Sequence, residues 1–222
     1  MADPYATRTP DLSGRPDGPP PWEGEVTARG GALIGPDGSF AGGGEGEPDF
    51  LVVPCCGIGT LAPFASIDPA TAVLLWIEHV AAPRDAGTAN DLLARLGDFE
   101  GRIYAVKQGC VGGPDERPGC ERVTPELVIR LLDARDSIAW ERDPDFGYEV
   151  PASVPGLDDP AARILEPRLL YADHDRVYEH AGLVVDKKRE RHDIAASVPG
   201  LDPAVRAATD WPPTVTSGDW RD

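Results

Sequence analysis

Residues 140–150 read WERDPDFGYEV, and residues 153–156 continue as SVPG. Each segment contains a turn-forming pair, Asp-Pro in the first and Pro-Gly in the second. Just before the first turn, Ile138, Trp140 and Arg142 alternate along the chain, which predicts a short strand. The stretch therefore predicts a strand that runs into an extended segment with two sharp turns.

Upstream of this stretch, residues 102–109 read RIYAVKQG and are followed by Gly112 and Gly113. The apolar run 103–106 predicts a strand that is closed by a glycine-rich turn. Residues 50–53 form another apolar run and predict a buried strand.

Two helices are predicted from their start signals. Asp68-Pro69 is an N-cap followed by a proline at the first helical position, and the apolar residues after it predict a helix over 69–80. Thr124-Pro125 predicts a second helix that runs to about residue 134. His79, near the end of the first helix, is interpreted as a helix-terminal or core histidine.

The segments 102–113 and 140–156 resemble, in order and spacing, the C-terminal part of phosphoenolpyruvate carboxykinase of the ATP type. That family has a strand and turn of the form vwLvNTGxxGG and a later segment DPxFGxEVPxSVPG. The resemblance covers roughly residues 50–201. It implies an α/β (mixed α+β) fold, namely a partial C-terminal domain of the phosphoenolpyruvate carboxykinase fold with a disordered N-terminal tail.

The domain organisation follows from the resemblance and from composition. Residues 1–48 are rich in glycine and proline and have few apolar anchors, so we expect a flexible segment. Within it, Trp22 and the triplet 32–34 are expected to dock locally. Residues 49–201 are expected to form the phosphoenolpyruvate carboxykinase C-terminal-like domain, and residues 202–222 a tail.

The resemblance also implies an activity, the gluconeogenic conversion of oxaloacetate and ATP to phosphoenolpyruvate, CO2 and ADP. Separately, no apolar run approaches the roughly 20 residues that span a bilayer, and the N-terminal sequence lacks the basic and apolar regions of a secretory signal, so we expect a cytoplasmic protein. A complete member of the family is far longer and carries a phosphate-binding glycine loop, divalent-metal ligands and an arginine for the carboxylate substrate. This sequence contains no G-x-x-x-x-G-K-[ST] motif. We therefore expect no catalytic residues and no Mg²⁺ or Mn²⁺ site in this chain.

One nucleotide contact is implied by the resemblance. Gly112 and Gly113 occupy the family's glycine turn, and Arg122 stands where the family has a nucleotide-binding arginine, so weak ATP binding is expected. Alternatively, the glycines are turn formers and Arg122 is an ordinary surface arginine. Lys107 and Gln108 replace the family's asparagine and threonine before the turn.

Other chemistry-bearing residues are open to more than one interpretation. Asp143, Asp145 and Glu149 form a carboxylate cluster of the kind that divides acid and base roles, although Asp143 is more simply a turn residue. The four cysteines, Cys55, Cys56, Cys110 and Cys120, fit no common zinc spacing. We interpret them as buried or half-buried free thiols, with a metal or redox site as the alternative.

The C-terminal third contains a repeat and a charged segment. SVPGLD occurs at 153–158 and again at 197–202, which indicates two similar turns. Between the copies, residues 173–193 are predicted to be helical, with Val177, Leu183 and Val184 as a narrow apolar stripe. The run 186–191 is interpreted as solvated charge.

The net charge of the chain limits the classes of partner that it can bind. The formal net charge is −17, so nucleic acid and anionic membrane surfaces are repelled and are not expected partners. Two hypotheses remain. The chain is a phosphoenolpyruvate carboxykinase that works as half of a split enzyme, with a separate chain that carries the missing N-terminal half. Alternatively, it is a non-catalytic remnant or accessory protein with at most weak nucleotide binding, which the missing motifs favour for the isolated chain.

Overall fold

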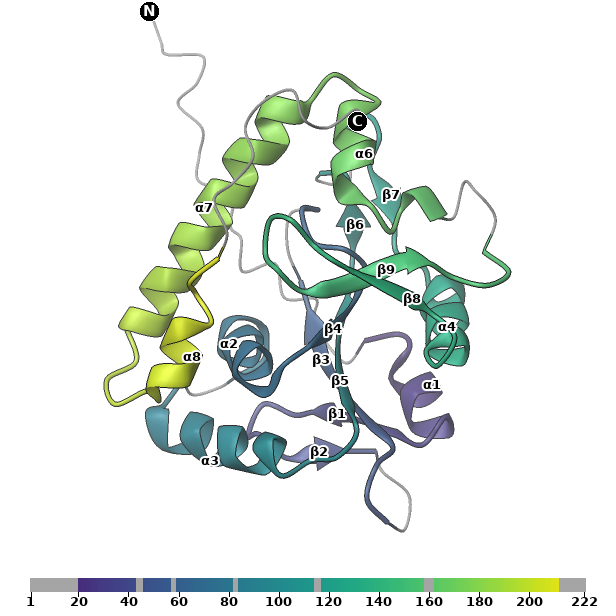
Figure 1. The fold of residues 1–222 in the computed structure, drawn as a ribbon. Coiled ribbons are helices and arrows are strands. Elements are labelled where there is room, and N and C mark those ends of the chain that lie inside the picture. The colour runs from purple at the N-terminus through teal and green to yellow at the C-terminus, as the bar shows by residue number, and fades with distance from the viewer. Residues whose placement is uncertain are drawn as a thin grey trace, which may run out of the picture.

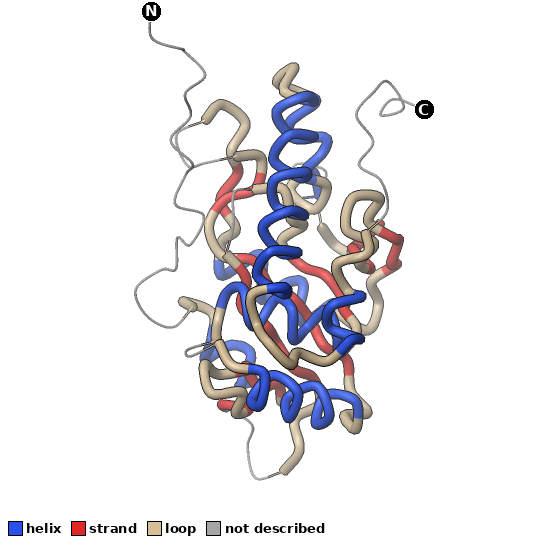
Figure 2. The backbone as a smooth tube through the Cα atoms, turned by 90° about the vertical axis from the view of Figure 1, so that its left-hand side faces the viewer, coloured by secondary structure: helices blue, strands red, loops and turns tan. Residues whose placement is uncertain are grey.

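The structure is a computed structural model that describes residues 20–42, 46–56, 59–81, 84–113, 117–157 and 162–211. One mixed sheet of seven strands has helices on both faces, as Figures 1 and 2 show. Its strands are β1 (Gly31–Ile34), β2 (Phe40–Ala41), β3 (Phe50–Cys55), β4 (Phe64–Ile67), β5 (Arg102–Lys107), β8 (Ala139–Arg142) and β9 (Glu149–Ser153). A separate two-stranded ribbon pairs β6 (Cys110–Val111) with β7 (Glu121–Arg122). The predicted α/β (mixed) class is confirmed.

The strand order is β2-β1-β3-β5-β4-β9-β8. β1, β3 and β5 are parallel, and β4, β9 and β8 extend the sheet in antiparallel fashion. The parallel register of β3 and β5 places Cys55 opposite Lys107, so both strands end side by side. This edge matters because open α/β sheets bind their ligands outside the carboxyl ends of parallel strands.

Helices cover the two faces of the sheet in unequal layers (Figure 1). They are α1 (Glu23–Ala28), α2 (Pro69–His79), α3 (Ala86–Gly97), α4 (Pro125–Ala134), α6 (Pro167–Ala172), α7 (Val177–Ala196) and α8 (Pro203–Ala207). Side chains alternate between faces along each strand. Leu51 and Val53 pack with α2, α3, α7 and α8, whereas Phe50 and Val52 pack with α1 and α4.

Helix starts follow the predicted capping signals. The Asp68 carboxylate accepts a 2.9 Å hydrogen bond from the Thr71 amide at the start of α2, where Pro69 is the first residue. Thr124 caps α4 in the same way, with its hydroxyl accepting from the Leu127 amide at 3.2 Å. Both helices therefore form where the sequence predicts them.

Residues 20–42, the first segment that the structure describes, are more ordered than the sequence predicts. They were expected to be flexible apart from local docking of Trp22 and the triplet 32–34. Trp22 and the triplet are indeed buried, but the segment is more ordered than expected, because α1 buries Val26 and β1 adds a parallel strand to β3. The few apolar residues of this segment are spaced so that Trp22, Val26 and Leu33 pack on one face of the sheet and Ala32 and Ile34 on the other, which average composition does not show. Residues 1–19 lie outside the described residues. The division into a 49–201 domain and flanking tails stays a prediction, although α8 buries Val205 beside α2.

The two SVPGLD copies form the same turn over their described residues. In both, the glycine has positive φ, 75° in the first and 80° in the second. In both, the leucine amide donates to the valine carbonyl, from Leu157 to Val154 at 3.2 Å and from Leu201 to Val198 at 3.4 Å. The repeat is therefore a shared turn that buries its valine.

α7 is a 20-residue helix that runs along the outside of α2 (Figures 1 and 2). It begins at Val177, four residues after the predicted start at 173. Within the described part of the chain, no helix combines the length and apolar character needed to cross a membrane.

Candidate functional site

The glycine-rich turn after β5 is a tightly packed piece of backbone. Gly112 and Gly113 have φ angles of 88° and 127°. The Gly112 amide donates to the Gly59 carbonyl at 3.1 Å. A Cβ atom at Gly112 would lie 2.3 Å from the Gly119 carbonyl oxygen. Conformation and space both require glycine at position 112, so this residue has a structural role in the turn.

The guanidinium of Arg176 holds this turn in place. Its Nη1 donates to the Gly112 carbonyl at 2.9 Å and to the Pro118 carbonyl at 2.7 Å. Nε and Nη2 both donate to the carboxylate of Glu179 at 2.8 Å. The guanidinium carbon also lies 4.7 Å from the centroid of the Tyr171 ring. Because these donors are used within the protein, Arg176 ties the turn to α7.

Arg122 lies on β7, opposite Cys110 of β6, and is exposed. The structure thus places the three predicted nucleotide contacts in one loop, with Gly112 and Gly113 buried and Arg122 at the surface. Nucleotide binding by these residues stays a prediction.

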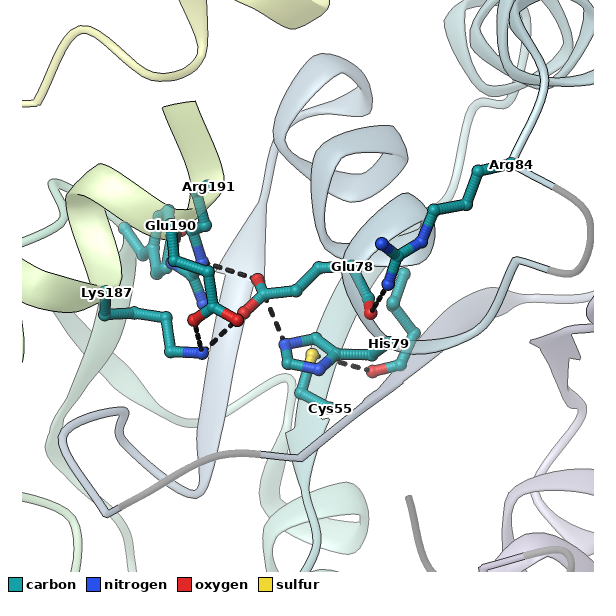
Figure 3. Close-up of polar contacts among 9 residues, drawn as sticks. Cys55, Glu78, His79, Arg84, Lys187, Glu190 and Arg191 are labelled. Atoms are coloured by element: carbon teal, nitrogen blue, oxygen red, sulfur yellow. Dashed lines mark hydrogen bonds and ion pairs between the residues drawn. The ribbon is translucent and has the colours of Figure 1, made fainter. Parts of the chain in front are cut away.

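A cluster of buried charged side chains lies near Cys55 at the end of β3 (Figure 3). Its centre is Glu78 in the last turn of α2. Glu78 Oε1 accepts a 2.8 Å hydrogen bond from Lys187 Nζ, and Oε2 accepts a 2.6 Å hydrogen bond from Arg191 Nε. Lys187 Nζ also donates to Glu190 at 2.6 Å. Buried charges are tolerated when they are paired in this way.

Arg191 connects the cluster to the β8–β9 hairpin. Its Nη1 donates to the Tyr148 hydroxyl at 2.7 Å. Its guanidinium carbon lies 5.0 Å from the centroid of the Phe146 ring and 5.9 Å from that of Trp211, within the range of cation–π attraction. One α7 side chain therefore contacts α2, the hairpin and the segment after α8.

The charges in this cluster set one another's ionisation. Burial by itself raises the pKa of Glu78, but Arg191, His79 and Lys187 outweigh burial and hold this pKa well below its usual value. His79 Nε2 lies 3.2 Å from Glu78 Oε2, and burial lowers the pKa of this histidine. The interpretation of His79 as a helix-terminal, buried histidine is confirmed.

The sequence did not indicate this cluster. The run 186–191 was interpreted as solvated charge, and this is wrong for Lys187 and Arg191, which are 1% and 0% exposed. Val184 lies on the buried stripe of α7 with these two residues, so helical spacing does place them together. Their partner Glu78 precedes Lys187 by 109 positions, and no local pattern points to a carboxylate so far away.

A small cavity lies among the side chains at the carboxyl edge of β3 and β5. Its volume is about 10 Å³, which is room for about one water molecule. Lys107, Cys55, Asp143 and Tyr148 line it among apolar residues. Burial lowers the pKa of Lys107 to about 8. Burial also raises the pKa of the Cys55 thiol, which therefore stays protonated at neutral pH.

The three carboxylates of the 143–149 segment do not share one role. Asp143 Oδ1 accepts hydrogen bonds from the amides of Asp145 at 2.9 Å and Phe146 at 2.6 Å, so it is the turn residue that the sequence predicts. Asp145 is buried, with Oδ2 3.9 Å from His180 Nε2. Burial and the neighbouring Asp143 raise the pKa of Asp145 to about 6. Glu149 is exposed on β9.

The cysteines are free thiols, as predicted. Cys55, Cys56 and Cys110 are buried and Cys120 is partly exposed. Among the described residues, no group of three or more His, Cys, Asp or Glu side chains is placed to hold a metal ion.

Comparison with curated proteins relates the chain to one enzyme family. Phosphoenolpyruvate carboxykinase (ATP) of Sinorhizobium fredii is 35% identical over 131 residues, which cover 54% of this chain and 23% of the relative. The Novosphingobium aromaticivorans protein of the same name is 31% identical over 111 residues, or 47% of this chain and 20% of the relative. The Brucella anthropi protein of the same name is 24% identical over 210 residues, which cover 79% of this chain and 38% of the relative. The chain is a distant, partial homologue of phosphoenolpyruvate carboxykinase (ATP).

The resemblance predicted from the sequence is thereby confirmed. The chain spans only 20% to 38% of the length of these phosphoenolpyruvate carboxykinase relatives. No protein-family model matches the chain.

Proposed function

We propose that this chain is a phosphoenolpyruvate carboxykinase-like protein that does not convert oxaloacetate by itself and binds ATP at most weakly at its glycine turn. This proposal rests on one observation: the backbone polar groups of Gly112 in the turn already make hydrogen bonds within the protein. The Gly112 amide is bonded to Gly59, and the Gly112 carbonyl is bonded to Arg176. A turn whose groups are already paired offers few of them to a phosphate chain. Arg122, exposed at the end of the turn, remains the contact that resemblance assigns to the nucleotide.

The positive charges of the core support the same conclusion. Phosphoryl transfer depends on cations that face the transferred group. Lys187 and Arg191 are instead bonded to Glu78 and are closed to solvent. The 222 residues also contain no phosphate-loop lysine after a glycine. Lys187 and Arg191 therefore stabilise the fold instead of facing a substrate.

The expected affinity for ATP follows from the phosphate-loop and metal contacts that a complete family member has and this sequence lacks. Each lost charge-assisted hydrogen bond is worth roughly 1.5–3 kcal/mol. Loss of several such contacts leaves a dissociation constant of about 1 mM or weaker.

Titration calorimetry with ATP and Mg²⁺ tests this proposal. The wild-type chain is expected to show weak heat at millimolar ATP, and Arg122→Ala is expected to abolish it. Arg189→Ala removes an equal charge from an exposed position on α7 and is expected to leave the signal unchanged. Micromolar binding that persists in Arg122→Ala would show that the nucleotide site lies elsewhere.

The partial alignments favour one second candidate. The Brucella anthropi relative aligns with 79% of this chain but with only 38% of its own length. A split enzyme would account for this if a separate chain carried the phosphate loop and metal ligands. Co-expression with such a chain from a neighbouring reading frame would then restore phosphoenolpyruvate formation. Both candidates would act in the cytoplasm.

A further inference from the structure

A second cavity, with a volume of about 390 Å³, lies between the β8–β9 hairpin and the chain that follows α8. Sites for small molecules usually have volumes of about 300–1,000 Å³. Figure 1 shows the loop of the hairpin reaching toward the segment after α8. Ile67 of β4 also lines the cavity, and it pairs with Ile103 near the start of β5. The cavity therefore lies at the other end of β5 from the glycine turn.

Three charged side chains of the cavity wall are not engaged by other described residues. Arg142, Glu149 and Asp210 line the cavity and are exposed, and within the described chain none of them makes a side-chain hydrogen bond or ion pair. Asp68 also lines the cavity, but both of its carboxylate oxygens accept hydrogen bonds from Thr71 at the start of α2. The described wall thus offers one guanidinium and two carboxylates to a ligand.

Arg142 and Glu149 are direct neighbours on the sheet. They stand opposite each other in the antiparallel pair β8–β9. Side chains in such positions share one face of the sheet, with Cβ atoms about 5 Å apart. The Arg142 guanidinium lies over Gly147, where an added Cβ atom would be 3.3 Å from Nη2. A ligand with a carboxylate and an ammonium group on the same carbon atom can therefore contact both charges.

Asp210 and Trp211 form the part of the wall that follows α8. The Trp211 ring is fixed from within the protein, because its centroid lies 6.0 Å from that of Phe146 and 5.9 Å from the guanidinium carbon of Arg191. A fixed ring offers an apolar surface to a hydrocarbon stem. The Asp210 carboxylate, next in the chain, is placed to accept hydrogen bonds from a cation at the end of that stem.

We propose that this cavity binds a free basic amino acid of the arginine or lysine type. The α-carboxylate of the ligand binds Arg142, and its α-ammonium binds Glu149. Its side-chain cation binds Asp210, with the stem along Trp211. The one anion and two cations of such a ligand match the one guanidinium and two carboxylates of the described wall. The inference does not depend on carboxykinase activity or on nucleotide binding at Arg122.

Titration calorimetry of the full chain with L-arginine and with agmatine tests the proposal. Agmatine is arginine without its carboxylate, and its higher positive charge is attracted more strongly by a chain of net charge −17. Arginine is nevertheless expected to bind at least about tenfold more tightly, because only arginine makes charge-assisted hydrogen bonds with Arg142. Arg142→Gln is expected to remove this preference, whereas the exposed control variant Arg189→Gln is expected to keep it. A preference that persists in Arg142→Gln would overturn the proposal.

Asp210→Asn tests the other end of the cavity. It is expected to weaken the binding of both arginine and agmatine at least about tenfold and to leave the preference for arginine unchanged. Asp186→Asn, at an exposed position on α7, is the matched control, and thermal unfolding shows that each variant is folded. The proposal would be wrong if Asp210→Asn bound arginine as tightly as wild type, or if wild type bound arginine and agmatine equally. It would also be wrong if arginine did not bind at about 10 mM.

Discussion

Arg191 Nε and Glu78 Oε2 lie 2.6 Å apart in the protein interior, where Arg191 is 0% and Glu78 7% exposed. One residue comes from α7 and the other from α2. The two helices are thus held together by a buried ion pair in addition to apolar contacts. A buried pair of this kind adds little net stability over an apolar pair of similar volume, but it is costly to break.

Glu78→Gln is expected to lower the free energy of unfolding by about 3–5 kcal/mol, because it leaves buried Arg191 without its carboxylate and Lys187 with that of Glu190 alone. Urea unfolding at pH 7 measures this loss. Glu100→Gln, at an exposed position, is the matched control and is expected to change stability by less than about 0.5 kcal/mol. Equal stability of the two variants would show that the buried pair does not hold α7.

The same substitution has a predictable pH dependence. The pKa of Glu78 is lowered in the folded chain, so its stabilising effect is present above the unfolded pKa, about 4.3. This effect is lost as the pH falls below that value. Urea unfolding between about pH 5 and pH 3 should therefore show the difference between wild type and Glu78→Gln shrinking toward acid. A difference that grows toward acid would contradict this assignment.

The contribution of Asp145 to stability is expected to change with pH in the opposite direction. Its folded pKa is raised to about 6, so the carboxyl favours the folded state when protonated, and this contribution is lost as the pH rises from about 4 through 6. Asp145→Asn, which cannot ionise, is expected to be more stable than wild type by about 1–2 kcal/mol at pH 7.5 and equal to it below about pH 4. Thermal unfolding across this range checks the prediction, with the exposed variant Asp186→Asn as control. A less stable Asp145→Asn at pH 7.5 would mean that attraction from Arg168 outweighs burial.

The glycine turn offers a matched pair of substitutions. Gly109 and Gly112 have nearly equal positive φ, 83° and 88°. A Cβ atom at Gly109 meets nothing within 4 Å, whereas one at Gly112 would lie 2.3 Å from the Gly119 carbonyl oxygen. Gly109→Ala is expected to lose about 1–2 kcal/mol from backbone conformation alone. Gly112→Ala is expected to lose clearly more in urea unfolding, and similar losses would show that the turn can relax around the added atom.

The sequence predicted those parts of the fold that depend on neighbouring residues. The Asp68 cap, the strand 103–106 and the Asp143 turn all form where local chemistry places them. The buried cluster could not be predicted in this way, because lysine and arginine are almost never fully buried unless paired. Their partner Glu78 lies on another helix, far away in the sequence. The order of the segment around Trp22 was underestimated for a related reason, since the burial of Val26 and of β1 depends on sheet faces that composition does not reveal.

We propose that the isolated chain does not work as a carboxykinase. The most direct test incubates the purified chain with oxaloacetate, ATP and Mg²⁺ or Mn²⁺ and measures phosphoenolpyruvate, with the full-length Sinorhizobium fredii enzyme as positive control. We expect no product above background, because none of the three lysines in the 222 residues follows a glycine as a phosphate-loop lysine does. Formation of phosphoenolpyruvate at about 1 s⁻¹, an ordinary rate for an enzyme, would contradict the claim.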